Sequence, residues 1–177
     1  MQKMMEWLEE EAKGVLPILG YIVLSALVIV SLDRVVATAL INWSLIEGPP
    51  LPKAGDPPFE YYNALQFAEL FFLGPLVEEV VFRVLPFAII IAFVTKSPKF
   101  VFGAVIFFAL LFGAGHSGGI LRMSQTAIAG FFFGLVFLKC GGLQKSFLKA
   151  SASTIASHGF TNLFIVLQEL WRYFALK

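Results

Sequence analysis

The chain has 177 residues, of which 58% are hydrophobic and 14% are charged, and its formal net charge is +1. Soluble domains are about 45–50% apolar and about 25% charged, so this composition indicates a membrane protein, and the small net charge argues against a nucleic-acid-binding surface. The single cysteine, Cys140, excludes an intramolecular disulfide. A chain of this length has room for about five or six membrane helices. We therefore expect an all-α, polytopic transmembrane helix bundle that forms a single domain over residues 1–177.

Residues 1–13 contain four glutamates and no basic start of the kind that a signal peptide has. We interpret 1–13 as a short amphipathic helix at the membrane surface. The uncharged segment Gly14–Leu32 is predicted to be the first span, and Asp33 and Arg34 are expected to end it or to mark the lipid boundary. A proline-rich loop from Glu47 to Pro58 follows, so residues 14–60 comprise the first span and this loop.

The apolar segment from Phe59 to Thr95 is too long for one straight span, because at 1.5 Å per residue it would be about 55 Å long. The Gly74-Pro75 pair is the expected break, since proline suits the first turn of a new helix. We therefore predict two helices, Tyr61–Leu73 and Pro75–Thr95.

Three further spans are predicted at Phe100–Leu121, Met123–Leu138 and Ala150–Gln168. The glycines of "GHSGG", residues 115–119, are expected to end the first of these. The pair Gly130 and Gly134 forms a G-x-x-x-G pattern, which lets two helices approach closely in lipid. The lysines fall on one side of the alternating spans, and the positive-inside rule makes that side cytoplasmic; they are Lys96, Lys99, Lys139, Lys145 and Lys149.

Several ionisable and polar residues lie within these apolar spans, where they are costly and by default mark a functional site. They are Glu78, Glu79, Arg83, His116, His158 and Asn162. Glu79 and Arg83 are four residues apart and can form an ion pair on a helix. Glu78 is turned by about 100° from Glu79, so it must find a partner on another helix or in a water-filled cavity. A structural ion pair without a catalytic role remains an open alternative.

The histidines are expected to reach the same place as Glu78. Glu78 near the start of one helix and His116 near the end of the next, antiparallel one share a depth in the bundle. His158 lies about 12 Å into the last span, and Asn162 shares its helix face. One water-filled pocket could hold all of these groups. The other interpretation of the His158–Asn162 pair is a hydrogen bond that joins two helices.

Three short motifs carry a resemblance to a known family. "EEVVFR" (78–83) matches E-E-x-x-x-R, "FGAGH" (112–116) matches F-x-x-x-H, and "HGFTN" (158–162) matches H-x-x-x-N/D, in this order and on separate predicted spans. Together they resemble the family of CAAX prenyl endopeptidases of the Ras-converting-enzyme type and the bacterial bacteriocin-processing and self-immunity proteins. The resemblance covers roughly residues 69–164, the four-helix core. The family usually has a glycine after the motif arginine, where this chain has Val84.

The resemblance implies an intramembrane glutamate-type endopeptidase that hydrolyses a peptide bond of a membrane-associated protein or peptide. By motif position, Glu78 would be the base that activates a water molecule, and His116 would hold and polarise that water. His158 and Asn162 would donate hydrogen bonds to the tetrahedral oxyanion. Hydrolysis needs a base, a water and an oxyanion stabiliser, so the chemistry is consistent with these roles.

Glu79 and Arg83 would, on the same analogy, fix the helix and the electrostatics around the base. The family analogy also implies a mechanism without a cofactor. The rival is a zinc site made of Glu78, His116 and His158, two imidazoles and one carboxylate. Against zinc, the chain has no H-E-x-x-H motif and the three residues lie on three separate predicted helices.

The expected partners are a protein or peptide substrate in the membrane and the lipid bilayer, with no nucleic acid. We expect a multi-pass protein of a prokaryotic cell membrane, with residues 61–177 as the catalytic core. A prenylated C-terminal peptide, a leader peptide and a C-terminal sorting anchor all fit as substrates, and the sequence does not indicate an oligomeric state. The alternative function is a non-catalytic membrane scaffold, or an immunity or partner-binding protein, with the same fold.

Overall fold

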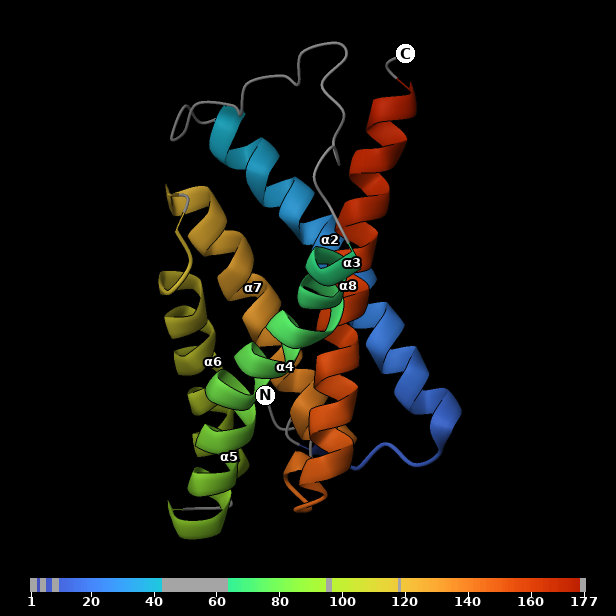
Figure 1. Ribbon diagram of the computed structural model, residues 1–177. Coiled ribbons are helices and arrows are strands. Elements are labelled where there is room, and N and C mark those ends of the chain that lie inside the picture. Colours follow the sequence, from blue (N-terminus) through green and yellow to red (C-terminus); the bar gives the residue numbers. More distant parts are fainter. Residues whose placement is uncertain are drawn as a thin grey trace.

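The structure, a computed structural model, describes residues 3, 6–7, 10–42, 64–94, 97–117 and 119–175. Within these residues every regular element is a helix and no strand is present, which confirms the all-α prediction for this part of the chain. The long helices are α2 (Val15–Asn42), α6 (Pro98–Ala114), α7 (Gly119–Phe137) and α8 (Phe147–Ala175). Between α2 and α6, a further helical run occupies residues 64–94 (Figure 1).

Helix α2 is longer than predicted, since it continues through Asp33 and Arg34 to Asn42. The helix therefore does not end at these two residues, and their place at the lipid boundary stays a prediction. Helix α8 supplies a partner at this point: Arg34 Nε and Nη2 donate to Gln168 Oε1 at 3.2 and 2.5 Å. The proline-rich loop that was predicted to follow, Glu47–Pro58, lies outside the described residues.

The N-terminal segment, of which only parts are described, is helical at Lys3, Glu6 and Trp7, as predicted. Residues 10–13 are not helical, so the helix is shorter than the predicted 1–13. They lie against the connection between α7 and α8, where Lys139 Nζ donates to the carbonyls of Trp7 and Glu10 at 2.6 and 2.5 Å. Lys149 forms an ion pair with Glu11. Glu10 N–H bonds to Glu6 O at 3.2 Å, and the lysines bond to carbonyl groups that the end of a helix leaves without partners.

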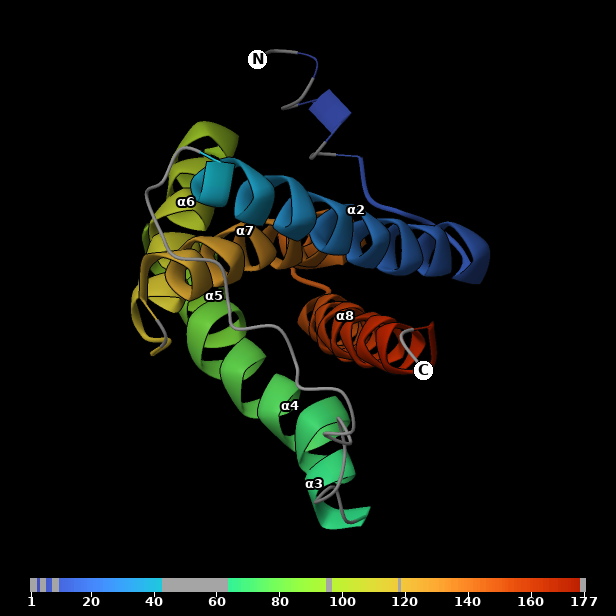
Figure 2. The ribbon, with the colours of Figure 1, turned by 90° about the horizontal axis from the view of Figure 1, so that it is seen from above.

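The run 64–94 alternates between α-helical and π-helical turns. Its parts are α3 (Ala64–Ala68), η1 (Glu69–Leu73), α4 (Gly74–Glu79), η2 (Val80–Val84), α5 (Leu85–Ile89) and η3 (Ile90–Val94). Figure 2 shows it as one curved helix, so the predicted break at Gly74-Pro75 is wrong. The predicted start at Tyr61 lies outside the described residues.

Proline causes a widened turn here and does not end the helix. Gly74 has ordinary right-handed helical angles, and its N–H bonds to Glu69 O, five residues back. Pro75 then follows in the first turn of α4. Because proline has no N–H and clashes with the carbonyl four residues before it, a π-turn at that point lets the helix continue. Pro86 is accommodated in the same way after η2.

Helices α6 and α7 pack closely at glycines, as the G-x-x-x-G pattern predicts. A Cβ atom on Gly134 would lie 2.8 Å from Val105 Cγ1, and one on Gly113 would lie 2.4 Å from Met123 O. On Gly130 it would lie 2.7 Å from Arg83 Nη2. The absence of side chains at these positions therefore brings the helices together and also leaves room for the Arg83 guanidinium.

A cluster of buried apolar side chains fixes the end of the bundle that is lower in Figure 1. Its fully or nearly fully buried members are Phe87, Ile91, Val101, Val105, Phe137, Leu138 and Ala150. Phe87 stacks on Phe137 with ring centroids 5.5 Å apart. This cluster joins α5, α6, α7 and the start of α8, and the polar residues predicted to form the site lie above it.

Two helical segments of the described chain are long and apolar enough to cross a membrane, Val15–Leu40 and Gly119–Gly142, and Lys99–Ala114 is a shorter apolar helix. The predicted number of five or six spans is not confirmed by this finding. Helix α6 ends at Ala114, directly before the "GHSGG" segment that was predicted to end it, and α8 continues beyond the predicted Gln168. The C-terminal ends of η3 and α7 lie at the same end of the bundle (Figure 1).

Candidate active site

The predicted ion pair between Glu79 and Arg83 is present and lies in the interior. Arg83 Nη1 is 3.0 Å from Glu79 Oε1, and the two side chains are 1% and 0% exposed. The Arg83 guanidinium lies over the Phe112 ring, 4.2 Å from its centroid, and against the bare backbone of Gly130. An arginine on an aromatic face gains a cation–π attraction that is larger when water is excluded. The pair is thus held by α4, η2, α6 and α7 together.

His158 on α8 bridges the two neighbouring glutamates. Its Nδ1 lies 2.9 Å from Glu79 Oε1, and its Nε2 lies 3.8 Å from Glu78 Oε2. The imidazole stacks on Phe133 with ring centroids 4.6 Å apart and an interplanar angle of 23°. These contacts fix the ring on three sides, so one edge of the imidazole faces the buried ion pair and the other faces Glu78.

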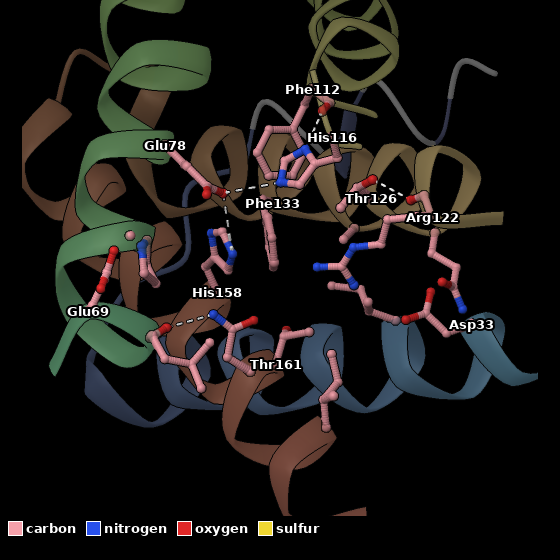
Figure 3. Close-up of a pocket in the computed structure, with 18 of the residues that line it drawn as sticks. Asp33, Glu69, Glu78, Phe112, His116, Arg122, Thr126, Phe133, His158 and Thr161 are labelled. Carbon is pink, nitrogen blue, oxygen red and sulfur yellow. Dashed lines mark hydrogen bonds and ion pairs between the residues drawn. The ribbon is translucent and has the colours of Figure 1, made fainter. Parts of the chain in front are cut away.

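Glu78 and His116 meet at the end of α6, as the antiparallel arrangement predicts. Glu78 Oε2 is 3.9 Å from His116 Nε2, and the two side chains are 35% and 23% exposed. His116 Nδ1 lies 2.7 Å from the Phe112 carbonyl oxygen. Figure 3 shows Glu78 with interactions to both histidines.

Both histidines are constrained to carry a proton on Nδ1. The Phe112 carbonyl can only accept a hydrogen bond, so His116 Nδ1 must donate to it. The Glu79 carboxylate, paired with Arg83, likewise accepts from His158 Nδ1. In each ring the remaining nitrogen, Nε2, is therefore the one that faces Glu78 and is available for chemistry.

Asn162 occupies the same face of α8 as His158, but its amide nitrogen donates to Leu70 O at 2.8 Å. That carbonyl is free because of the π-turn: its usual helical donor, the N–H of Gly74, bonds to Glu69 O instead. A Cβ on Gly159 would lie 2.7 Å from Phe71 O, so glycine allows α8 to approach η1 this closely. An amide nitrogen has two N–H groups, so Asn162 keeps one donor beyond the Leu70 bond.

A cavity of about 430 Å³ lies in front of these groups. Glu78, His116, His158 and Asn162 all line it, whereas Glu79 and Arg83 do not and remain behind it. The sequence therefore correctly predicts one pocket for the first four residues. The cavity wall comes from α2, the 64–94 run, the end of α6, α7 and α8.

Sequence reasoning missed the part of the cavity formed by α2 and α7. Asp33 and Arg122 line it there, together with Gln125 and Thr126. Asp33 was expected to end the first span or to mark the lipid boundary, and Arg122 fell between the predicted spans Phe100–Leu121 and Met123–Leu138. The signal that could have found them is the one used for Glu78, namely a charge beside a long apolar segment.

No three histidine, cysteine, aspartate or glutamate side chains of the described residues form a group that could hold a metal ion. Glu78, His116 and His158, the residues of the rival zinc hypothesis, come near one another through the contacts given above. Their separations of 3.8 and 3.9 Å are longer than a direct hydrogen bond. A bridging water molecule fits such a spacing.

The family model described as "Rce1-like: Type II CAAX prenyl endopeptidase Rce1-like" matches residues 61–164, more than half of the chain. The match includes all three motifs, from Glu78 to Asn162. No curated protein and no solved structure matches the chain.

Proposed function

This chain belongs to the Rce1-like family of type II CAAX prenyl endopeptidases, and we propose that it is an intramembrane endopeptidase in which Glu78 activates a water molecule. Family membership suggests a CAAX-protease-type peptidase activity, and together with the two long apolar helices it indicates a membrane protein. The glutamic type of the reaction, the residue roles and the multi-pass topology in a prokaryotic cell membrane are parts of the proposal.

The observation that carries the proposal is the position of Glu78 Oε2 between two imidazole nitrogens at the wall of a cavity. It lies 3.9 Å from His116 Nε2 and 3.8 Å from His158 Nε2. A water molecule among these three groups would be oriented by all of them, and a substrate in the cavity of about 430 Å³ would reach it. A buried ion pair alone would not require an arrangement of this kind.

The proposed reaction begins with proton transfer from that water to Glu78. The Nε2 lone pair of His116 accepts the second proton of the water as a hydrogen bond, which directs the oxygen lone pair at the substrate. The hydroxide adds to the carbon of the scissile carbonyl, whose π electrons move onto oxygen. Protonated Glu78 then gives its proton to the amide nitrogen as the C–N bond breaks, leaving a carboxylic acid and an amine.

The negative charge that develops on the carbonyl oxygen needs donors. His158 can supply one when both ring nitrogens are protonated, because Nδ1–H is already given to Glu79 and Nε2–H faces the cavity. In that form the two glutamates, Arg83 and the imidazolium sum to zero charge, which suits a site shielded from water. The second N–H of Asn162 is the other proposed donor. Preorganised donors of this kind are worth about 2.7–4 kcal/mol each.

Glu79 and Arg83 have a positioning role in this proposal, since neither lines the cavity. Glu79 holds His158 through Nδ1, and Arg83 holds Glu79. The proposed reaction uses no metal, and its substrates are membrane-associated proteins or peptides that can place a peptide bond in the cavity.

The test is cleavage of a quenched fluorescent peptide library by the purified protein in lipid nanodiscs. We expect Glu78→Gln to lower the rate by about 10²–10⁴-fold, the usual contribution of a general base. Glu10→Gln, at an exposed glutamate of the N-terminal segment that does not line the cavity, serves as the control and should retain activity. Equal rates for wild type and Glu78→Gln would contradict the proposal.

A chelator arm separates the glutamate mechanism from the zinc rival. Activity that persists in chelator and is lost in Glu78→Gln supports the proposal. Activity that is lost in chelator and restored by zinc would favour a site made of Glu78, His116 and His158. The scaffold alternative would be supported if a correctly folded wild-type protein cleaves no member of the library.

A further inference from the structure

The cavity has a cationic side chain that the proposed reaction does not use. Arg122, near the start of α7, is an exposed residue that lines the cavity, and Figure 3 shows its guanidinium reaching into the cavity between the histidines and Asp33. Within the described part of the chain, its guanidinium makes no hydrogen bond or ion pair. A guanidinium is a planar fork of donors that matches a carboxylate in a bidentate pair.

Asp33 is the acidic neighbour of Arg122. Arg122 and Arg34 both act electrostatically on Asp33, and Arg34 follows it directly on α2. Arg122 lines this cavity, whereas Arg34 lines two other hollows, so the charges of Asp33 and Arg122 cancel on this side. Asp33 Oδ1 is buried and has no hydrogen-bond partner among the described residues, so an acceptor also remains open beside the cation.

The opposite side of the cavity holds the groups of the proposed reaction. Glu78 lies on the cavity wall there, and Glu79 lies behind it with Arg83. With His158 protonated, as in the proposed reaction, the two glutamates, Arg83 and His158 sum to zero charge, so these groups leave no unpaired cation for a substrate carboxylate. The Arg122 guanidinium makes no ion pair among the described residues, so a carboxylate in the cavity gains a charge-assisted pair there.

We propose that Arg122 forms a carboxylate-binding subsite that sets the direction in which a peptide substrate lies in the cavity. The substrate carboxylate pairs with the Arg122 guanidinium, and a substrate N–H close to it donates to Asp33 Oδ1. The scissile bond then lies toward Glu78, on the other side of the cavity. The inference rests on the proposed function in one respect, that the occupant is a substrate peptide. The carboxylate is either the free C-terminus of the peptide or the side chain of an acidic residue.

The cleavage experiment compares three forms of one randomised quenched hexapeptide library. The first has a free C-terminal carboxylate, the second a C-terminal amide, and the third an amide with one position fixed as glutamate. Wild-type protein should cleave the first or the third with a KM about tenfold lower than the second, the value of one charge-assisted pair. Preference for the first identifies the C-terminus as the source of the carboxylate, and preference for the third identifies a side chain.

Arg122→Gln should bring that KM ratio close to one, and Arg122→Lys, which keeps the charge but not the fork, should keep part of it. Lys99→Gln removes an exposed cation of α6 that does not line the cavity, so the ratio should stay as in wild type. An unchanged ratio in Arg122→Gln would overturn the inference. So would a loss of equal size on all three libraries, because that result assigns Arg122 a structural role.

A binding arm separates failure of this inference from failure of the proposed function. The three libraries, fluorescently labelled, are titrated by anisotropy against nanodiscs that hold Glu78→Gln or Glu78→Gln/Arg122→Gln. The single variant should bind a carboxylate form about tenfold more tightly than the amide form, and the double variant should not. This result supports the subsite even if wild type cleaves nothing. Equal binding of all forms by the single variant overturns it.

Discussion

Glu78 and Glu79 are neighbours in sequence but lie in two different environments. Glu79 is fully buried, and one of its oxygens accepts from both Arg83 and His158. Glu78 is about one-third exposed and lines a cavity between two imidazole nitrogens. The two environments share His158, which contacts each glutamate through a different ring nitrogen. One helical step of about 100° thus separates a charge held by the interior from a charge available to a substrate.

The comparison shows how a membrane helix can carry three charges at once. The buried pair is held by an ion pair, a histidine and an aromatic face. Glu79 Oε2 and Arg83 Nη2 have no hydrogen-bond partner among the described residues. The exposed glutamate is partnered only across gaps that suit water. We therefore expect substitutions behind the cavity to change stability first and substitutions on its wall to change catalysis first.

The largest expected effect on stability comes from substitution of Glu79. Glu79→Gln leaves Arg83 as an unpaired buried cation, so we expect a loss of about 3–5 kcal/mol in the free energy of unfolding. The measurement is unfolding by denaturant in mixed detergent micelles, with Glu69→Gln as the exposed control. Wild-type stability in Glu79→Gln would show that the buried pair does not support the fold.

Asn162 lies on the cavity wall, so its substitution tests whether residues there contribute to catalysis more than to stability. Asn162→Ala removes the proposed oxyanion donor, and kcat should fall about 10²–10³-fold. The loss of the bond to Leu70 should cost only about 1 kcal/mol in unfolding. Asn162→Asp keeps the shape but not the N–H groups, so it should lose a similar part of kcat. An unchanged kcat in both variants would remove Asn162 from the proposed mechanism.

Gly130 tests how tightly the buried pair is held. In Gly130→Ala the new methyl group would lie 2.7 Å from Arg83 Nη2 and 2.9 Å from Phe112 Cδ1. Overpacking of this kind costs about 1–3 kcal/mol. Gly103→Ala in α6, where no atom lies within 4 Å of the added Cβ, is the matched control and should not destabilise the protein. If Gly130→Ala and Gly103→Ala have the same free energy of unfolding, the Arg83 side chain can move away from the added methyl group and is not tightly held.

The smallest expected effect comes from substitution of Phe133, which packs against His158, the residue that contacts both glutamates. Phe133→Leu removes the ring stacked on His158, and aromatic pairs contribute about 0.5–1.5 kcal/mol beyond their buried area. We expect a stability loss of about that size and a few-fold fall in kcat. The control is Phe132→Leu on the same helix, which leaves His158 untouched and should keep kcat.

The site was predictable where it depends on local spacing. The four-residue separation of Glu79 and Arg83 predicts their ion pair, and the same separation of His158 and Asn162 predicts that both reach one cavity. Helix periodicity is enough for such pairs. The antiparallel return of α6 was sufficient to bring His116 to the depth of Glu78.

The remaining features depend on contacts that spacing does not encode. Gly74-Pro75 was expected to break the helix, because proline usually does so, but a π-turn and a partner on α8 stabilise a continuous run. The free Leu70 carbonyl that binds Asn162 follows from that π-turn. Asp33 and Arg122 join the cavity only because α2 continues past its predicted end and lies against α7 and α8.

The most direct test of the account is a paired measurement on Glu78→Gln and Glu79→Gln in nanodiscs, with peptide cleavage and unfolding recorded on the same preparations. We predict that Glu78→Gln keeps near-wild-type stability and loses cleavage about 10²–10⁴-fold, whereas Glu79→Gln loses about 3–5 kcal/mol in the free energy of unfolding. The contradicting result is the reverse: a Glu78→Gln protein that cleaves at the wild-type rate, or one that loses its stability while Glu79→Gln keeps it.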